Sequence, residues 1–247
     1  MAKVLRELKG HSNSKVSLVE DKGKIFVRKS GDISRNMERY SSLASTPLRM
    51  PRILEYRGDS YDMEYIPNLD IKSYLSKNSV GGLVEYIKYV MSVFSNQTIE
   101  ADFTPIYKKK LSEFNFDLYP MPFTADELIA KLPQFLPFSE YHGDLTLENI
   151  LYDTQEGQFV LIDPISTEYS SYVFDLAKLR QDLTCKWFIR NSSVYFDSKL
   201  EKIASELRMF KHFDNDYLLI LMLMRVLPYA TPIDQIYLND EIIKLWK

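Results

Sequence analysis

The chain has 247 residues, a length that suits one two-lobed domain or two small ones. Hydrophobic residues make up 45% and charged residues 26%, the usual balance of a soluble globular protein with a full core. The net charge of −3 provides no basic field for nucleic acid. Cys185 is the single cysteine, which excludes an intramolecular disulfide framework. We expect a cytoplasmic protein without a signal peptide, membrane insertion or a nucleic-acid partner.

The first part of the chain has the patterns of a small sheet with one helix. Strands are predicted over 15–20 and 24–30 with a turn between them, and again over 52–56. The segment 60–67 is predicted to contain the last strand and a hinge. A helix is predicted over 32–44, because apolar residues recur there at helical spacing. A loop rich in serine and asparagine, residues 10–14, leads into the first of these strands. These patterns predict a small antiparallel sheet that one helix accompanies.

From residue 69 onward the pattern is mostly helical. Helices are predicted over 71–75, 83–94, 198–210, 216–227 and 231–246. The segment 103–138 contains five prolines and is predicted to be irregular, except for a helix that begins at a capping box at Thr124. Thr231 followed by Pro232 is a strong helix start.

A cluster of polar residues surrounds a predicted hairpin. The run His142-Gly143-Asp144 is followed by Asn149, by strands over 149–152 and 158–162, and by Asp163. Asn149 and Asp163 therefore lie at the two open ends of one ribbon. A carboxylate and an amide oxygen are suitable ligands for magnesium, and an exposed aspartate such as Asp144 is anionic at neutral pH.

The complete spacing resembles the catalytic core of protein-kinase-like phosphotransferases. With glycine at position 143, it is similar to the aminoglycoside phosphotransferase and choline kinase family, which phosphorylates small molecules. The resemblance implies an α+β fold of two lobes. Residues 1–67 would form a nucleotide-binding lobe with a small antiparallel sheet and a hinge. Residues 68–247 would form a larger, mostly helical lobe with the catalytic loop and the acceptor site.

The resemblance also implies roles for individual residues. Asp144 would orient the attacking hydroxyl and accept its proton, and Asn149 and Asp163 would bind Mg²⁺. In the N-terminal lobe, Lys29 would reach the α- and β-phosphates, and Glu38 is the candidate ion-pair partner of Lys29. The other expected nucleotide contacts are Ser12 in the phosphate loop, Val27 above the adenine, and the hinge backbone at Glu64 and Ile66.

For two more residues, the sequence leaves two interpretations of their role open. Asp175, in the run Asp175-Leu176-Ala177 that resembles a motif of small-molecule kinases, either braces the catalytic loop or caps a helix. Arg225, in an apolar helix, either binds an anionic part of the acceptor or extends to the surface. The aromatic residues of 107–123 either line an acceptor pocket or fill the core, and we favour the core.

The predicted function is transfer of a phosphoryl group from ATP, or alternatively GTP, with Mg²⁺, to a hydroxyl of a small molecule. The runs around Asp144, Asp163 and Asp175 resemble phosphotransferases associated with bacterial surface polysaccharides, so a sugar is the first expected acceptor. An amino alcohol such as choline, or an aminoglycoside, is the second. A non-catalytic nucleotide-binding module is the rival class, because Pro164 stands where the family has glycine and the glycine-rich loop is missing. A protein kinase is opposed by the absence of an activation segment.

Overall fold

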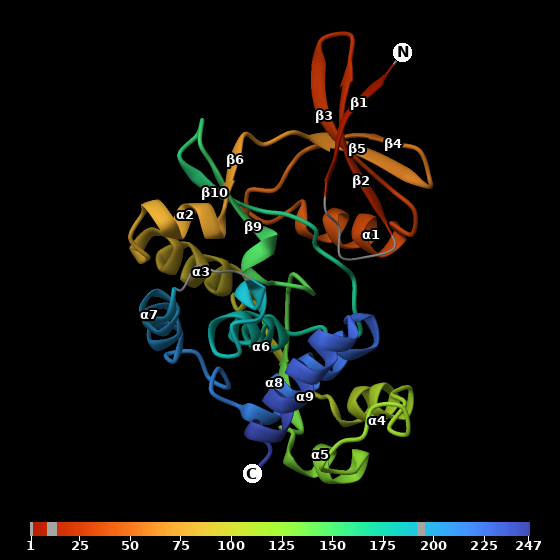
Figure 1. Ribbon diagram of the computed structural model, residues 1–247, viewed down its shortest axis with the longest axis vertical. Helices are drawn as coiled ribbons and strands as arrows, with labels where there is room; N and C mark the ends of the chain where they lie inside the picture. The colour runs from red at the N-terminus through yellow and green to blue at the C-terminus, as the bar shows by residue number, and fades with distance from the viewer. Residues whose placement is uncertain (1, 9–13, 192–195) are drawn as a thin grey trace. The chain divides into compact units, whose positions relative to one another are not determined.

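The chain forms two compact units, traced in Figure 1. The computed structural model describes residues 2–8, 14–191 and 196–247, so Ser12 lies outside the described residues. The sheet unit consists of residues 1–78 and 148–167, and the helical unit of residues 79–147 and 168–247. The sheet unit contains the whole of the expected N-terminal lobe, residues 1–67, together with the hairpin that follows the catalytic loop.

The sheet unit is built on a five-stranded antiparallel sheet with the order β1-β2-β3-β5-β4. Its strands are β1 (Lys3–Leu8), β2 (Lys15–Asp21), β3 (Lys24–Ser30), β4 (Ile53–Tyr56) and β5 (Ser60–Glu64). At the turn between β2 and β3, Lys22 and Gly23 both have positive φ, 50° and 76°. A two-residue hairpin turn whose twist matches the strands requires such angles at both central positions. The strands predicted over 15–20, 24–30 and 52–56 are confirmed, and β5 confirms the strand expected within 60–67.

Strand β1 was not predicted. Its residues are almost all exposed, so the apolar alternation that reveals a half-buried strand is missing. It forms one edge of the sheet, and β4 forms the other. Both edge pairings contain a shift in register, between Val4 and Arg6 in β1 and between Ile53 and Glu55 in β4.

Helix α1 (Ser34–Leu43) packs its apolar face on the sheet, as the spacing of its residues predicts. Ile33 and Tyr40 form a buried cluster with Tyr61 of β5. The rings of Tyr40 and Tyr61 meet edge to face with their centroids 6.0 Å apart. This packing fixes the helix against β5.

A second, three-stranded sheet has the order β10-β9-β6. It is formed by β6 (Asn68–Asp70), β9 (Ile150–Asp153) and β10 (Gln158–Leu161), and α2 (Ile71–Lys77) follows β6 directly. In the β9–β10 hairpin, Ile150 pairs with Leu161 and Asp153 with Gln158. The hairpin predicted from the sequence is confirmed, and the short helix η1 (Leu147–Asn149) precedes it.

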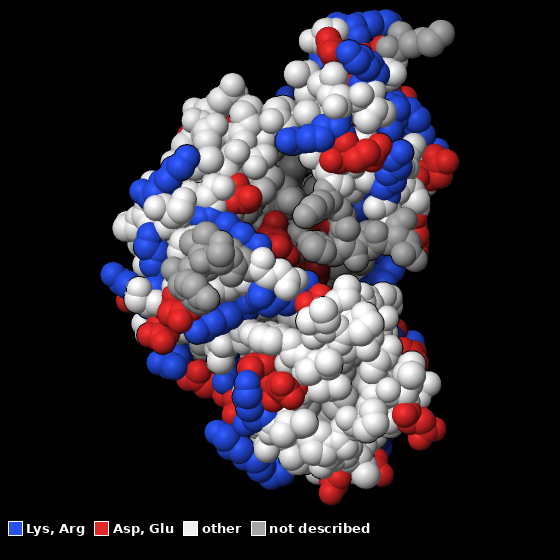
Figure 2. Space-filling view, in the orientation of Figure 1, with Lys and Arg blue, Asp and Glu red and all other residues white. Residues whose placement is uncertain are grey.

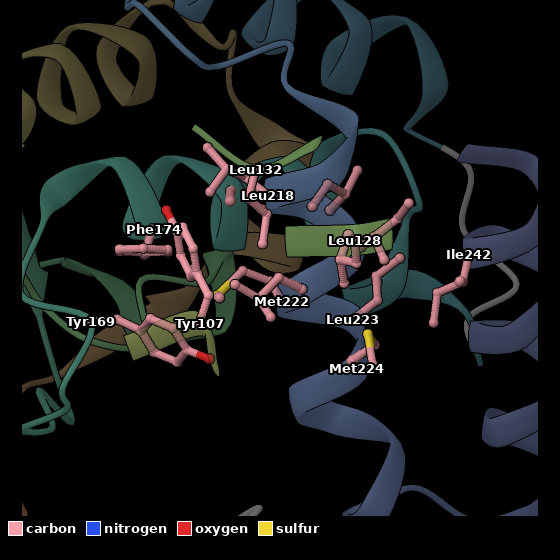
Figure 3. Close-up of a cluster of buried hydrophobic side chains, with 14 of the residues drawn as sticks. Tyr107, Leu128, Leu132, Tyr169, Phe174, Leu218, Met222, Leu223, Met224 and Ile242 are labelled. Carbon is pink, nitrogen blue, oxygen red and sulfur yellow. The ribbon is translucent and has the colours of Figure 1, made fainter. Parts of the chain in front are cut away.

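The helical unit has its core around α8. Its elements are α3 (Gly81–Phe94), β7 (Ile99–Asp102), α4 (Thr104–Ser112), α5 (Ala125–Lys131), β8 (Phe135–Phe138), α6 (Tyr172–Leu183), η2 (Trp187–Ile189), α7 (Asp197–Leu207), α8 (Asp216–Val226), η3 (Leu227–Tyr229) and α9 (Pro232–Leu245). Residues 218–224 of α8 are all buried. Figure 3 shows Met222 and Leu223 of α8 in the cluster that also holds the rings of Tyr107, Tyr169 and Phe174.

The segment 103–138 is more regular than predicted. Its first helix, α4, has Pro105 in its first turn, where the missing N–H costs nothing. The strand β8 contains Pro137 and pairs with β7 from before the segment. Two of the five prolines that suggested an irregular chain, Pro105 and Pro137, therefore occupy positions that ordinary elements tolerate. Both predicted helix starts are confirmed: Thr124 forms a capping box with Glu127 at α5, and Thr231 is the N-cap of α9.

The surface over α9 carries few charges (Figure 2). Ile233, Ile236 and Ile243 of this helix are all more than half exposed. Within the described part of the chain, none of the helices combines the length and the apolar character that crossing a bilayer requires.

The stability of the sheet unit is expected to depend on pH through Glu64. Arg49 binds the Glu64 carboxylate, with Nη2 2.7 Å from Oε1, and lowers the pKa of Glu64 to about 2. The unfolded chain protonates this group nearer pH 4.5, so the stabilisation is present above that pH and is lost as the pH falls toward 2. We therefore expect the difference in unfolding free energy between wild type and Arg49→Met, measured with urea, to be larger at pH 6 than at pH 3. An equal difference at both pH values would contradict this assignment.

Candidate active site

Three polar residues lie on one face of the buried helix α6. Asp175, Lys178 and Asp182 follow the spacing i, i+3, i+7, which places them in one row along the helix. All three are buried, at 1%, 6% and 0% exposure. The helix is capped by Ser171, which accepts a hydrogen bond from the backbone of Val173, so Asp175 is not its cap. We call these three residues the α6 row.

The α6 row holds the catalytic loop, residues 142–147, by its backbone. The Asp175 carboxylate accepts hydrogen bonds from the backbone N–H groups of His142, Gly143 (2.9 Å) and Leu145 (3.4 Å). The Asp182 carboxylate accepts one from the N–H of Leu147 at 2.7 Å. Burial raises the pKa of Asp175, even though these N–H groups favour its anion. The expected bracing contacts of Asp175 are confirmed, and Asp182 adds a support that the sequence reasoning missed.

The remaining member of the row contacts the candidate base. Lys178 Nζ lies 3.0 Å from Oδ1 of Asp144, and the Asp144 side chain is 40% exposed. Burial acts to raise the pKa of Asp144, but the positive charges of Lys178 and Arg225 outweigh it, so the pKa lies below its usual value. Asp144 is therefore an anion at neutral pH with one oxygen held in place, as a general base requires.

In the sheet unit, Lys29 forms an ion pair with Asp163. Strand alternation puts Lys29 and Val27 on one face of β3, and both are buried, at 3% and 7% exposure. Lys29 Nζ contacts Oδ1 of Asp163. Arg28 points to the other face and pairs with Asp62, Nε to Oδ1, at 2.7 Å. Lys29 and Val27 therefore share a buried face of β3.

The prediction that Glu38 forms an ion pair with Lys29 was wrong. Glu38 is exposed on α1, and within the described residues Lys29 pairs with Asp163 instead. The residue of α1 that reaches this site is Asn36, which is 4% exposed. Its Nδ2 donates to Oδ1 of Asp163 at 2.9 Å and to the Pro164 carbonyl at 2.8 Å. The sequence contains a sign of this role, because Asn36 is a polar residue on the apolar face of the predicted helix, between Ile33 and Tyr40.

The loop after Asp163 is fixed although it lacks the glycine of the family pattern. Asp163 itself has a positive φ of 57°, which is uncommon for a residue with a side chain. Asn36 holds both Asp163 and Pro164, and Arg35 exchanges two hydrogen bonds with Ser166, at 2.8 and 2.9 Å. An unfavourable backbone angle that several contacts maintain is typical of a functional position.

Asn149 and Asp163 lie at the same end of the β9–β10 hairpin, as predicted. The carbonyl of Asn149 accepts a hydrogen bond from the N–H of Ile162, the residue before Asp163, at 3.0 Å. Both hydrogen bonds to the Asp163 carboxylate end on Oδ1, which leaves Oδ2 without a partner among the described residues. The described chain has no cluster of three or more metal-ligating His, Cys, Asp or Glu residues. One carboxylate and one amide fit Mg²⁺, which is usually completed by water and phosphate oxygens.

Glu64 and Ile66, the two expected hinge residues, both lie in the sheet unit. Glu64 ends β5, and its N–H donates to the Arg52 carbonyl at 2.9 Å. Ile66 is buried, and its carbonyl accepts a hydrogen bond from Asn68 Nδ2 at 2.7 Å. Their contacts with adenine stay predictions.

The chain is similar in structure to several small-molecule kinases. It matches a thermostable mutant of aminoglycoside phosphotransferase APH(4)-Ia, solved with ADP and hygromycin B, with a TM-score of 0.66 and 12% identity over 99% of this chain and 93% of that one. A candidate fructosamine-3-kinase from Thermobifida fusca matches with a TM-score of 0.61 and 13% identity, over 99% and 93%. An ethanolamine kinase from Plasmodium vivax gives 0.58 and 12%, over 98% and 81%.

No protein-family model matches the sequence, and neither does any curated protein. The structural likeness extends over nearly the whole chain and establishes the fold at identities that sequence comparison does not detect. The chain therefore has the protein-kinase-like fold that these small-molecule kinases share, with a small antiparallel sheet part and a helical part.

Replacing Asp175 tests whether the α6 row holds the catalytic loop. In Asp175→Asn, an amide N–H₂ would face backbone donors that now bind a carboxylate. Each buried donor that loses its acceptor costs about 1–3 kcal/mol, so we expect unfolding free energy to fall by that order. Urea unfolding measures the loss. Asp214→Asn is the control, because Asp214 lies at the surface with 58% of its side chain exposed. Equal stability of the two variants would contradict the assignment.

Proposed function

We propose that the protein is a magnesium-dependent kinase that transfers the γ-phosphoryl group of ATP to a hydroxyl of a small molecule. The observation that carries this proposal is the state of Asp144: an exposed carboxylate on a braced loop, with Lys178 on one oxygen and a lowered pKa. In a protein-kinase-like fold, a carboxylate at this point of the catalytic loop accepts the proton of the attacking hydroxyl.

The reaction divides among the residues as follows. The acceptor oxygen bonds to the γ-phosphorus while the bond between that phosphorus and the bridging oxygen of ADP breaks. The hydroxyl proton passes to Asp144. Lys178 keeps Asp144 oriented and anionic until then. The product is a phosphate monoester of the acceptor together with ADP.

The nucleotide and its metal are assigned to the sheet unit. Lys29 would bind the α- and β-phosphates, and Asp163 and Asn149 would hold Mg²⁺, which neutralises the phosphate charge when bound. Val27, which shares the buried face of β3 with Lys29, would cover the adenine, and the backbone of Glu64 and Ile66 would pair with its edge. ATP is the donor we assign first, and GTP is the alternative. A reaction that consumes ATP and requires magnesium suits the cytoplasm.

A sugar or sugar derivative is the acceptor that we propose. The runs around Asp144 and Asp175 resemble phosphotransferases linked to surface polysaccharides, and one structural neighbour is a candidate fructosamine-3-kinase. The other neighbours are an aminoglycoside phosphotransferase and an ethanolamine kinase, which makes amino alcohols and aminoglycosides the alternative acceptors.

Nucleotide turnover tests the proposal directly. We expect ADP release with magnesium and ATP to be stimulated by a sugar, within a panel that also contains choline, ethanolamine and aminoglycosides. In Asp144→Asn the stimulated rate should fall by at least about 100-fold, because general-base catalysis contributes about 10²–10⁴-fold. Binding of the nucleotide with magnesium, measured by calorimetry, should stay within a few-fold of wild type.

The outcomes separate the rival functions. Nucleotide binding without any turnover that depends on Asp144 would favour a non-catalytic nucleotide-binding module. Failure to bind the nucleotide with magnesium would overturn the roles of Lys29, Asn149 and Asp163. The matched variant Asp214→Asn should behave as wild type in both assays.

The pH profile tests the pairing of Asp144 with Lys178. Because the pKa of Asp144 is lowered, kcat/KM should hold its plateau into mildly acid solution and fall only as the pH drops through that pKa. Lys178→Met removes the nearest positive charge and should move the acid limb to higher pH. Lys178→Arg keeps a cation and should move it less. An acid limb at the same pH in Lys178→Met and wild type would refute this role.

A further inference from the structure

A pocket of about 340 Å³ lies within the helical unit. That volume is at the lower end of the range of small-molecule sites, about 300–1,000 Å³. Its wall combines aromatic rings with one arginine. These residues belong to the segment after α4, to the loop before α6, and to α8 and η3. The residues that matter here are Phe114, Tyr119, Tyr169, Tyr229, Met224 and Arg225.

Arg225 has no anionic partner within ion-pair distance among the described residues. It lies in α8, whose residues 218–224 are all apolar and buried. Its guanidinium packs 5.1 Å from the centroid of the Tyr169 ring, and it donates to Sδ of Met222 at 3.3 Å and to the Gly143 carbonyl at 3.5 Å. Two of its five N–H donors are thus used, and three are left for a ligand. Of the two earlier interpretations, an anion site suits this geometry better than simple extension to the surface.

The same guanidinium connects the pocket to the catalytic loop. Gly143, whose carbonyl it contacts, directly precedes Asp144. The charge of Arg225 also contributes to the lowered pKa of Asp144. A ligand bound to Arg225 would therefore lie beside the loop that carries the proposed base.

The charges around the pocket disfavour a cationic ligand. The single carboxylate in its lining is Glu113, which already pairs with Lys110 at 3.0 Å. Lys110 and Lys109 also share Glu168, at 2.9 and 2.8 Å. A cation would have to displace a lysine to find a carboxylate. An anion finds a guanidinium that has no carboxylate within ion-pair distance among the described residues.

We propose that the acceptor is a sugar acid, a ring with hydroxyls and one carboxylate. The carboxylate would form paired hydrogen bonds with Arg225, and the ring would pack on Tyr169 and the neighbouring aromatic side chains. One guanidinium balances the single charge of a carboxylate. The carboxylate stays unchanged in the reaction, while a hydroxyl of the ring receives the phosphoryl group. This inference rests on the proposed kinase function and narrows it to one acceptor class.

Ligands that share one ring and differ in one substituent test this assignment. In the glucose series these are glucuronate, glucose, glucosamine and glucose 6-phosphate, and galacturonate with galactose supplies a second ring. Binding to wild type is measured by saturation-transfer NMR, which needs no turnover, and kcat/KM by ADP release. We expect a sugar acid to bind more tightly than the neutral, amino or phosphorylated sugar of its ring. Arg225→Met should weaken that binding about 10–100-fold, and Arg225→Lys should weaken it less.

Arg208→Met is the matched control, since Arg208 is exposed and lies outside the pocket lining. It should leave the binding of the acid unchanged. Equal or tighter binding of the neutral or amino sugar, a preference for the phosphate, or the absence of any binding by the acids would each overturn the proposal. Phosphorylation of a neutral or amino sugar that depends on Asp144 would overturn the sugar-acid proposal and would support the kinase function. Binding of the acid that depends on Arg225, without any phosphorylation, would keep the pocket assignment and count against the kinase.

Discussion

In the helical unit, the buried helix α6 directs three charged side chains toward the loop of residues 142–147, and the shape of that loop depends on them. Asp175, Lys178 and Asp182 occupy positions on α6 that an apolar residue would otherwise fill, and each contacts the segment 142–147. The backbone N–H groups of a loop are not hydrogen-bonded within a helix or a sheet, so the shape of the loop depends on the acceptors that surround it. Here the acceptors come from one rigid helix, and the same helix supplies the lysine that orients Asp144. The position of Asp144 therefore depends on α6, and its charge state depends on Lys178 of α6 together with Arg225 of α8.

In the sheet unit, fewer residues hold the corresponding carboxylate, that of Asp163. Lys29 and Asn36 both bind Oδ1 of Asp163, and Asn36 also binds the next carbonyl. A buried lysine requires a compensating carboxylate. Asp163, which supplies it, has a positive φ that is uncommon for residues other than glycine. The other carboxylate oxygen stays available for a metal. Pro164 then replaces glycine without loss of order, because α1 holds the following loop through Arg35 and Ser166.

Most of the fold could be predicted, because its strands and helices carry strong local patterns. The β2–β3 and β9–β10 hairpins and the capped helices α5 and α9 are examples. Strand β1 and the β7–β8 pair could not be, since exposed or proline-containing strands are defined by partners distant in the sequence. In the site, the resemblance to small-molecule kinases pointed to Lys29. Glu38 was selected as its partner because charge was expected to meet charge, and Asn36 was missed. The contacts of Lys178 and Asp182 depend on which face of α6 meets the loop, which a sequence does not reveal by itself.

The two edges of the five-stranded sheet have a consequence for the molecule in concentrated solution. An edge strand with regular spacing offers a row of free backbone groups to any other strand, including one from another copy. Here β1 and β4 each contain a register shift, and charged side chains such as Arg6, Glu7 and Glu55 occupy them. A shifted, charged edge pairs poorly with a straight strand. The sheet is thereby protected against growth by strand addition, so its exposed edges need no covering partner.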